Sequence, residues 1–94
     1  MTTTTQRTDD LVLYHFESCP YCARVRSKIA ELGLEGIEFR DIREEPRYYE
    51  ELVAARGVRT VPVLKISTPG GDETWMPESA DIVRYLDERY GNPS

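Results

Sequence analysis

Both cysteines of this 94-residue chain stand in one motif, Cys19-Pro20-Tyr21-Cys22. The motif follows an apolar run at residues 11–16 and opens a helical pattern, and a C-x-x-C at such a turn is typical of thiol–disulfide chemistry. Pro20 suits the first turn of a helix. Cys19 is therefore expected near the N-cap, where free N–H groups and the helix dipole favour a thiolate. Cys22 lies one turn further on, close enough to attack a mixed disulfide formed on Cys19.

Other uses of the two cysteines fit the sequence less well. A structural disulfide across so short a loop would stabilise the fold little, because the entropic effect grows with loop length. Zinc takes about four ligands, and His15 is the only histidine in the chain. Haem attachment needs a histidine directly after the second cysteine, where this chain has Ala23. The motif therefore favours redox use over a metal site.

Composition indicates one acidic domain. The net charge of −5 argues against binding to a phosphate backbone, so no nucleic-acid partner is expected. Arg24, Arg26 and Lys28 nevertheless form a local basic cluster just after the motif. This cluster is either a solvated helix face or a group that holds an anionic thiolate or an anionic thiol substrate.

The first ten residues are polar, with a threonine run and no apolar segment. We therefore expect a disordered leader over residues 1–10, no signal peptide, and a folded domain over residues 11–91. No stretch approaches the roughly 20 apolar residues of a membrane span. A cytoplasmic location follows, where thiols are kept reduced and a C-x-x-C is more often catalytic than structural.

Hydrophobic periodicity predicts seven elements. Strands are expected at residues 11–16, 37–42, 61–66 and Glu73–Met76, with the last two joined as an antiparallel hairpin by a turn at residues 68–72. Helices are expected from the C-x-x-C to Gly33, from about Pro46 to Gly57, and over Ser79–Tyr90. The order β-α-β-α-β-β-α, with the C-x-x-C after the first strand, resembles the thioredoxin-like fold, an α/β class with a four-stranded mixed sheet.

Each predicted helix has an apolar face. The inward-facing residues are expected to be Cys22, Val25, Ile29 and Leu32 in the first helix, Tyr48, Tyr49, Leu52 and Val53 in the second, and Ile82, Val83, Leu86 and Tyr90 in the third. Because Cys22 shares the apolar stripe, it should be more buried than Cys19, which is expected to face solvent.

A second motif is Thr60-Val61-Pro62. A proline can open an ordinary strand, because it cannot donate to the ladder further in. Together with the C-x-x-C, however, this motif resembles that of the glutaredoxin family, in which Thr-Val-Pro carries a cis proline beside the active cysteine. The resemblance implies that the backbone of Val61 pairs with the cysteinyl part of glutathione, as in β-augmentation.

A third segment, Met76-Pro77-Glu78-Ser79, resembles the glutamate–serine segment of the thioredoxin-like N-terminal domain of glutathione transferases. Ser79 is expected at a helix N-terminus, where free N–H groups favour a carboxylate, and Glu78 can pair with an ammonium. A γ-glutamyl group carries both charges on one carbon. The alternative interpretation is plain helix capping by Ser79.

The chain departs from these families in three places. Many glutaredoxins carry Lys or Arg three residues before the first cysteine, to hold the glycine carboxylate of glutathione, whereas this chain has Phe16. Arg59 is the nearest candidate cation. The family's Gly-Gly before the last helix is absent, and Gly70-Gly71 lies in the predicted hairpin turn. The all-helical second domain of a full transferase is also absent from this sequence, so conjugation is not expected.

The resemblance implies a glutathione-dependent dithiol disulfide oxidoreductase that reduces protein disulfides and glutathione mixed disulfides. Cys19 would attack, and Cys22 or free glutathione would resolve the intermediate. Glutathione is the expected co-substrate, no metal is expected, and the partners would be oxidised or glutathionylated proteins acting on a monomer. The residues expected to bind glutathione are Tyr21, Arg59, Thr60, Val61, Pro62, Glu78 and Ser79.

Two other functions stay open at this point. A thioredoxin-reductase-driven reductase is compatible with the missing cation at Phe16. A binding module that carries a metal or an iron–sulfur cluster is also possible, with Cys19 from each of two chains and glutathione completing the ligand shell.

Overall fold

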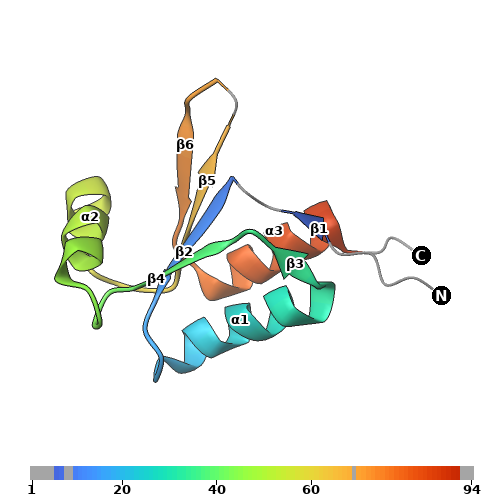
Figure 1. Ribbon diagram of the computed structural model, residues 1–94, viewed down its shortest axis with the longest axis horizontal. Coiled ribbons are helices and arrows are strands. Elements are labelled where there is room, and N and C mark those ends of the chain that lie inside the picture. The colour runs from blue at the N-terminus through green and yellow to red at the C-terminus, as the bar shows by residue number, and fades with distance from the viewer. Residues whose placement is uncertain (1–5, 8–9, 69, 92–94) are drawn as a thin grey trace.

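The computed structural model describes residues 6–7, 10–68 and 70–91. A four-stranded sheet in the order β4-β2-β5-β6 has α2 on one face and α1 and α3 on the other (Figure 1). The strands are β2 (Leu11–His15), β4 (Glu38–Asp41), β5 (Val63–Ser67) and β6 (Glu73–Met76), and the helices are α1 (Pro20–Leu32), α2 (Pro46–Arg56) and α3 (Ser79–Tyr90). Strand β2 pairs parallel with β4 and antiparallel with β5, which forms an antiparallel hairpin with β6.

The predicted order of elements and the mixed four-stranded sheet are confirmed, and the arrangement is thioredoxin-like. Strand β5 begins at Val63 rather than at Val61. Pro62, which has no N–H to donate to a ladder, follows a cis bond from Val61 and ends the connecting segment instead. Within the described residues, no helix is long and apolar enough to cross a membrane.

Two short strands were not predicted. Strand β1 (Gln6–Arg7) pairs parallel with β3 (Leu34–Glu35), beside the end of α1. The disordered leader expected over residues 1–10 is therefore wrong at Gln6–Arg7, while residues 1–5, 8 and 9 lie outside the described residues. Two-residue strands are too short to show a period-two pattern in the sequence.

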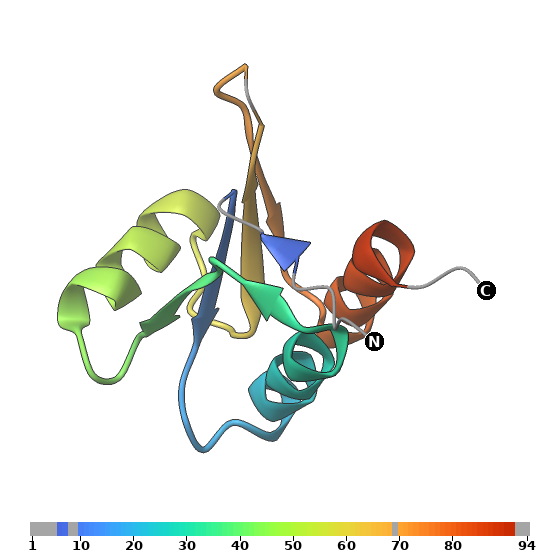
Figure 2. The same ribbon diagram turned by 45° about the vertical axis from the view of Figure 1, so that its right-hand side comes forward.

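The larger core lies between the sheet and the pair α1 and α3 (Figure 2). It contains Leu11, Leu13, Val25, Ile29, Leu34, Ile37, Leu64, Ile66, Ile82 and Leu86. At the surface of this layer, the Nζ atom of Lys28 lies 2.8 Å from Glu31 and 3.1 Å from Asp87, so that α1 is linked to α3. Lys28 of the basic cluster is thus bound to neighbouring carboxylates.

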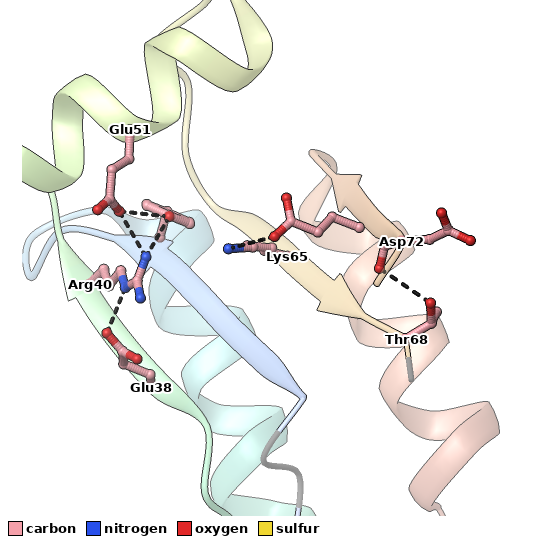
Figure 3. Close-up of polar contacts among 8 residues, drawn as sticks. Glu38, Arg40, Glu51, Lys65, Thr68 and Asp72 are labelled. Carbon is pink, nitrogen blue, oxygen red and sulfur yellow. Dashed lines mark hydrogen bonds and ion pairs between the residues drawn. The ribbon is translucent and has the colours of Figure 1, made fainter. Parts of the chain in front are cut away.

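On the opposite face of the sheet, Arg40 of β4 contacts Glu51 of α2 and Glu38 (Figure 3). The buried Tyr14 of β2 belongs to the same polar network. The Tyr14 hydroxyl donates to Glu51 Oε1 over 2.9 Å and accepts from Arg40 Nη1 over 2.9 Å, while Arg40 also contacts Glu51 and Glu38. Burial, and then the bond to Glu51, raises the pKa of Tyr14 to about 12. The network links α2 to strands β2 and β4.

Helix α2 buries a narrower stripe than its sequence predicts. Leu52 is its buried residue and Tyr48 packs beside it against the sheet, but the side chain of Tyr49 is 36% exposed. The prediction that Tyr49 faces inward is therefore wrong, because α2 covers only part of its sheet face. Helix α2 ends at Gly57, whose φ of 74° is left-handed and whose N–H donates to Val53.

Candidate functional site

Cys19 is the N-cap residue of α1, as its sequence position predicts. Its backbone is extended (φ −78°, ψ 120°), and its Sγ accepts a hydrogen bond from the backbone N–H of Cys22 over 3.3 Å. Its carbonyl accepts from Ala23, the first bond of the helix. A donor N–H and the positive end of the helix dipole therefore both face the sulfur of Cys19, and both stabilise negative charge there.

The two sulfurs differ in exposure less than the sequence predicts. Cys22 is fully buried on the apolar stripe, as expected, but the side chain of Cys19 is only 5% exposed. The prediction of a solvent-facing Cys19 is therefore wrong for the isolated chain. The tertiary structure places Cys19 in the wall of a cavity that is also lined by the β4–α2 connection, by α2 and by the segment before β5.

Burial, and then the hydrogen bond with Cys19, raises the pKa of the Cys22 thiol to about 12. Cys22 is therefore a neutral thiol at physiological pH. A buried thiol that is protonated at this pH is a poor first nucleophile, because the thiolate is the species that attacks a disulfide.

Arg26 holds the loop that leads into Cys19. Its guanidinium donates to the carbonyls of Phe16 and Glu17, and its Nη1 lies 3.0 Å from Nδ1 of the buried His15. Burial, and then the charge of Arg26, lowers the pKa of His15, so the neutral ring accepts from the guanidinium. Arg26 and His15 thus position the loop before the C-x-x-C.

Arg43 reaches the same loop from the β4–α2 connection. Its guanidinium carbon lies 3.9 Å from the centre of the Phe16 ring, and its Nη1 donates to Ser18 over 3.4 Å. Asp41 accepts the backbone N–H groups of Arg43 and Glu44, which fixes this turn. The positive charge of Arg43 therefore lies beside the ring of Phe16. Arg43 was missed by the sequence reasoning, because its contact with Phe16 joins residues that are far apart in the sequence.

Two cavities flank the Thr60-Val61 segment. The Glu78 cavity has a volume of about 380 Å³ and is lined by Tyr21, Arg56, Thr60, Val61, Pro62, Pro77, Glu78 and Ser79. The Cys19 cavity has a volume of about 560 Å³ and is lined by Phe16, Cys19, Ile42, Arg43, Tyr49, Arg59, Thr60 and Val61. Thr60 and Val61 line both cavities, so the two adjoin along this segment.

The cavities divide the residues that the sequence singled out. Tyr21, Glu78 and Ser79 lie together in the Glu78 cavity, whereas Arg59 lies in the Cys19 cavity. Tyr21 is 61% exposed, so it forms an outer rim rather than a packed wall. Arg56 is a further residue that sequence reasoning missed, because a basic residue in the last turn of a helix is common in any helix.

The start of α3 rules out one of the two interpretations of Ser79. Glu78 is the N-cap residue, with φ −95° and ψ 130°, and Ser79 is the first helical residue. The Glu78 side chain makes no capping bond. Plain capping by Ser79 is therefore wrong, and the N–H groups of the first turn of α3, which lack partners within a helix, lie beside the Glu78 cavity.

Among the residues that the structure describes, no group of three or more His, Cys, Asp or Glu side chains could hold a metal ion.

The burial of the two thiols predicts selective labelling. In the reduced native protein at pH 8, iodoacetamide should modify Cys19 alone, because less than about one Cys22 in a thousand is ionised at a pKa near 12. Peptide mapping by mass spectrometry would locate the label, and unfolding in guanidinium should expose both sites as a control. Faster labelling of Cys22 in the native protein would contradict the assignment.

Comparison with known proteins places this site in a family. The family model described as "Glutathione S-transferase, N-terminal domain" matches residues 13–94. Glutaredoxin 2 of Escherichia coli K12 is 33% identical over 87 residues, an alignment that covers 86% of this chain and 34% of that protein. The chain thus spans about a third of the length of this curated relative.

Two solved structures illustrate the similarity in fold. Maleylacetoacetate isomerase from Anaeromyxobacter dehalogenans 2CP-1, with GSH bound in its active site, is 30% identical with a TM-score of 0.66, covering 89% of this chain and 39% of that one. An epsilon-class glutathione S-transferase from the housefly, Musca domestica, is 25% identical with a TM-score of 0.68, covering 87% and 36%. With the family match over residues 13–94, the chain belongs to the glutathione S-transferase N-terminal domain family.

Proposed function

We propose that this protein is a glutathione-dependent dithiol disulfide oxidoreductase of the glutaredoxin type. The observation that carries the proposal is the placement of Cys19 at the N-cap of α1, with a backbone N–H on its sulfur, in a cavity that adjoins the Glu78 cavity. The similarity to Glutaredoxin 2 supports the reaction, and the GSH-bound isomerase supports glutathione as the ligand.

The reaction begins with attack of the Cys19 thiolate on one sulfur of a disulfide. The S–S bond of the substrate breaks, a mixed disulfide forms on Cys19, and the leaving thiolate takes a proton from solvent. For a glutathionylated substrate, a free glutathione thiolate then attacks the sulfur of the glutathione bound to Cys19, releasing Cys19 and oxidised glutathione. For a protein disulfide, Cys22 attacks Cys19 instead, and two molecules of glutathione reduce the resulting Cys19–Cys22 disulfide.

The charges of the two cavities support one orientation of glutathione. Its γ-glutamyl end would occupy the Glu78 cavity, near the first turn of α3, and its cysteinyl part would lie along Val61. The glycine carboxylate would then lie in the Cys19 cavity, which contains Arg43 and Arg59. Arg43 stacks on Phe16 and supplies the positive charge that position 16 lacks.

The proposal also covers the setting of the reaction. Oxidised and glutathionylated proteins would be the partners of a monomer that acts in the cytoplasm, where thiols are kept reduced.

The source of electrons tests the function. Reduction of a glutathione mixed disulfide and of a protein disulfide would be followed as NADPH oxidation, once with glutathione and glutathione reductase and once with thioredoxin and thioredoxin reductase. Turnover is expected with the glutathione system. Turnover with the thioredoxin system alone would replace the proposal with the thioredoxin-reductase-driven alternative. Conjugation of glutathione to 1-chloro-2,4-dinitrobenzene without disulfide reduction would point to a transferase.

A further inference from the structure

A third cavity, the Val58 cavity, continues from the Cys19 cavity at the end of α2. It has a volume of about 420 Å³ and is lined by Tyr49, Val53, Gly57, Val58, Arg59 and Thr60. Tyr49, Arg59 and Thr60 also line the Cys19 cavity, so the two cavities adjoin there. Of these lining residues, Thr60 alone also lines the Glu78 cavity. The Cys19 cavity therefore lies in the middle of a series of three, and the Val58 cavity lies beyond the part that the glycine of glutathione would occupy.

Exposed apolar side chains gather around this series of cavities. Among the described residues, the large hydrophobic side chains that are exposed are Tyr21, Phe39, Tyr49 and Val58. Tyr49 and Val58 line the Val58 cavity and Tyr21 lines the Glu78 cavity, whereas Phe39 lines none of the three. Val58 is 44% exposed, so much of its side chain is free to contact another molecule. Clustered apolar and aromatic side chains at a surface are typical of a site that binds a partner.

The charge of the Val58 cavity restricts what that partner carries. Of the described residues that line it, Arg59 alone is charged, and the residues that line the Cys19 cavity include Arg43 and Arg59 but no carboxylate. Neither arginine pairs with a carboxylate of a described residue, whereas other cations do, namely Lys28, Arg40, Lys65, Arg84 and Arg89. A positive charge beside an apolar surface is complementary to a partner with an acidic side chain next to an apolar one.

The position of the Val58 cavity indicates which partner this is. A disulfide that Cys19 attacks must place one sulfur in the Cys19 cavity, and in a protein substrate that sulfur belongs to a continuous polypeptide. The residues on either side of the substrate cysteine therefore extend past the Cys19 cavity. Glutathione, in contrast, ends at its glycine and has no further residue to place there. The Val58 cavity is thus positioned for a polypeptide rather than for glutathione.

We propose that the Val58 cavity is a docking site for the polypeptide next to the reactive disulfide of a protein substrate. An apolar side chain of that polypeptide packs against Tyr49, Val53 and Val58, and an acidic side chain pairs with Arg59. The acidic residue lies nearer to the substrate cysteine, because Arg59 stands where the two cavities adjoin. The inference rests on the proposed function and adds to it a preference among protein disulfides.

The test uses disulfide-linked dimers of three symmetric peptides, so that the direction of the bound chain does not matter. Their sequences are Leu-Glu-Cys-Glu-Leu, Leu-Lys-Cys-Lys-Leu and Ser-Glu-Cys-Glu-Ser, called the Leu-Glu, Leu-Lys and Ser-Glu dimers. Cys19 displaces one peptide as a thiol and retains the other in a mixed disulfide, and two molecules of glutathione become oxidised glutathione in each turnover. Values of kcat/KM are measured with glutathione and glutathione reductase. The mixed disulfide of glutathione and cysteamine serves as a substrate without flanking residues.

Reversal of the charge at position 59 tests the acidic preference. In Arg59→Glu, the ratio of kcat/KM for the Leu-Glu dimer to that for the Leu-Lys dimer should fall about tenfold from its wild-type value, because an attraction becomes a repulsion. Arg47→Glu is the matched control, since Arg47 is an exposed cation of α2 that lines none of the three cavities and the two variants have equal net charge. Its ratio should equal that of the wild type. A ratio within one variant also cancels any effect of Arg59 on the use of glutathione.

Truncation at position 58 tests the apolar contact. Val58→Ser should lower kcat/KM for the Leu-Glu dimer about fivefold, because part of an apolar contact is lost. It should leave the Ser-Glu dimer and the glutathione–cysteamine disulfide unaffected. The melting temperature should stay close to that of the wild type, since the side chain of Val58 is exposed.

The contrary outcomes are distinct. If Arg59→Glu and Arg47→Glu shift the ratio equally, the preference follows net charge and the inference is wrong. If Val58→Ser slows all substrates equally, it acts through the fold and the inference is wrong. A dimer in sedimentation that Val58→Ser dissociates would assign the cavity to a second copy of the chain and overturn the inference. In each case the proposed function stands if the wild type reduces the glutathione–cysteamine disulfide. If it reduces neither that disulfide nor the peptide dimers with glutathione, the proposed function fails, and the inference with it.

Discussion

The Cys19→Ser variant is expected to lose disulfide-reducing activity by ~10³-fold or more with every substrate, because it removes the attacking sulfur on which both branches of the reaction depend. A serine hydroxyl is not ionised near neutral pH and is a poor nucleophile at that position. Turnover of a glutathione mixed disulfide and of a protein disulfide, measured with glutathione and glutathione reductase, would give both rates.

The fold provides an internal control for this variant. Serine is a favoured N-cap residue, and its hydroxyl can accept the Cys22 N–H that the Cys19 sulfur accepts in the native chain. The free energy of unfolding of Cys19→Ser in urea should therefore stay within about 1 kcal/mol of that of the wild type. Residual activity within tenfold of the wild type in the folded variant would show that another group makes the first attack.

Substitution of Cys22 should separate the two activities. Reduction of protein disulfides is expected to fall roughly 100-fold, because the intramolecular resolving thiol is lost. Reduction of glutathione mixed disulfides should stay within about threefold of the wild type, since free glutathione can resolve the intermediate on Cys19. Parallel assays of the two substrates with the glutathione system would measure the split.

Two variants are needed at position 22 because the site is fully buried. Cys22→Ser places a hydroxyl in an apolar stripe, whereas Cys22→Ala avoids an unsatisfied polar group at the expense of a small cavity. The same split in both variants would assign it to the missing thiol. Equal loss of both activities in two folded variants would contradict resolution by glutathione.

The raised pKa of Cys22 fits its proposed part in the second step. Burial is the largest cause of its rise to about 12, and the hydrogen bond and charge of Cys19 act in the same direction. In the proposed reaction, Cys22 is therefore a protonated thiol while Cys19 makes the first attack.

The sequence determines those parts of the site that depend on neighbours along the chain. An N-cap, a proline in the first turn and a bond from residue 22 to residue 19 all lie within four residues, so their geometry follows from local preferences. The buried stripe with Cys22 and the hairpin of β5 and β6 follow from periodicity and turn chemistry in the same way.

Only the tertiary structure decides which cations reach the site. Arg43 reaches the Phe16 ring across 27 positions of sequence, and Arg56 and Arg59, three residues apart, line different cavities. Arg26 and Lys28, which the sequence groups together, contact a loop and helix α3 instead. Helix α2, which Glu51 links to Tyr14 and Arg40 of the sheet, carries Arg56 and leads into Arg59, whereas the packing of α1 against α3 brings Lys28 to Asp87. No local pattern encodes these placements, because long side chains bind whichever partner the packed elements bring within reach.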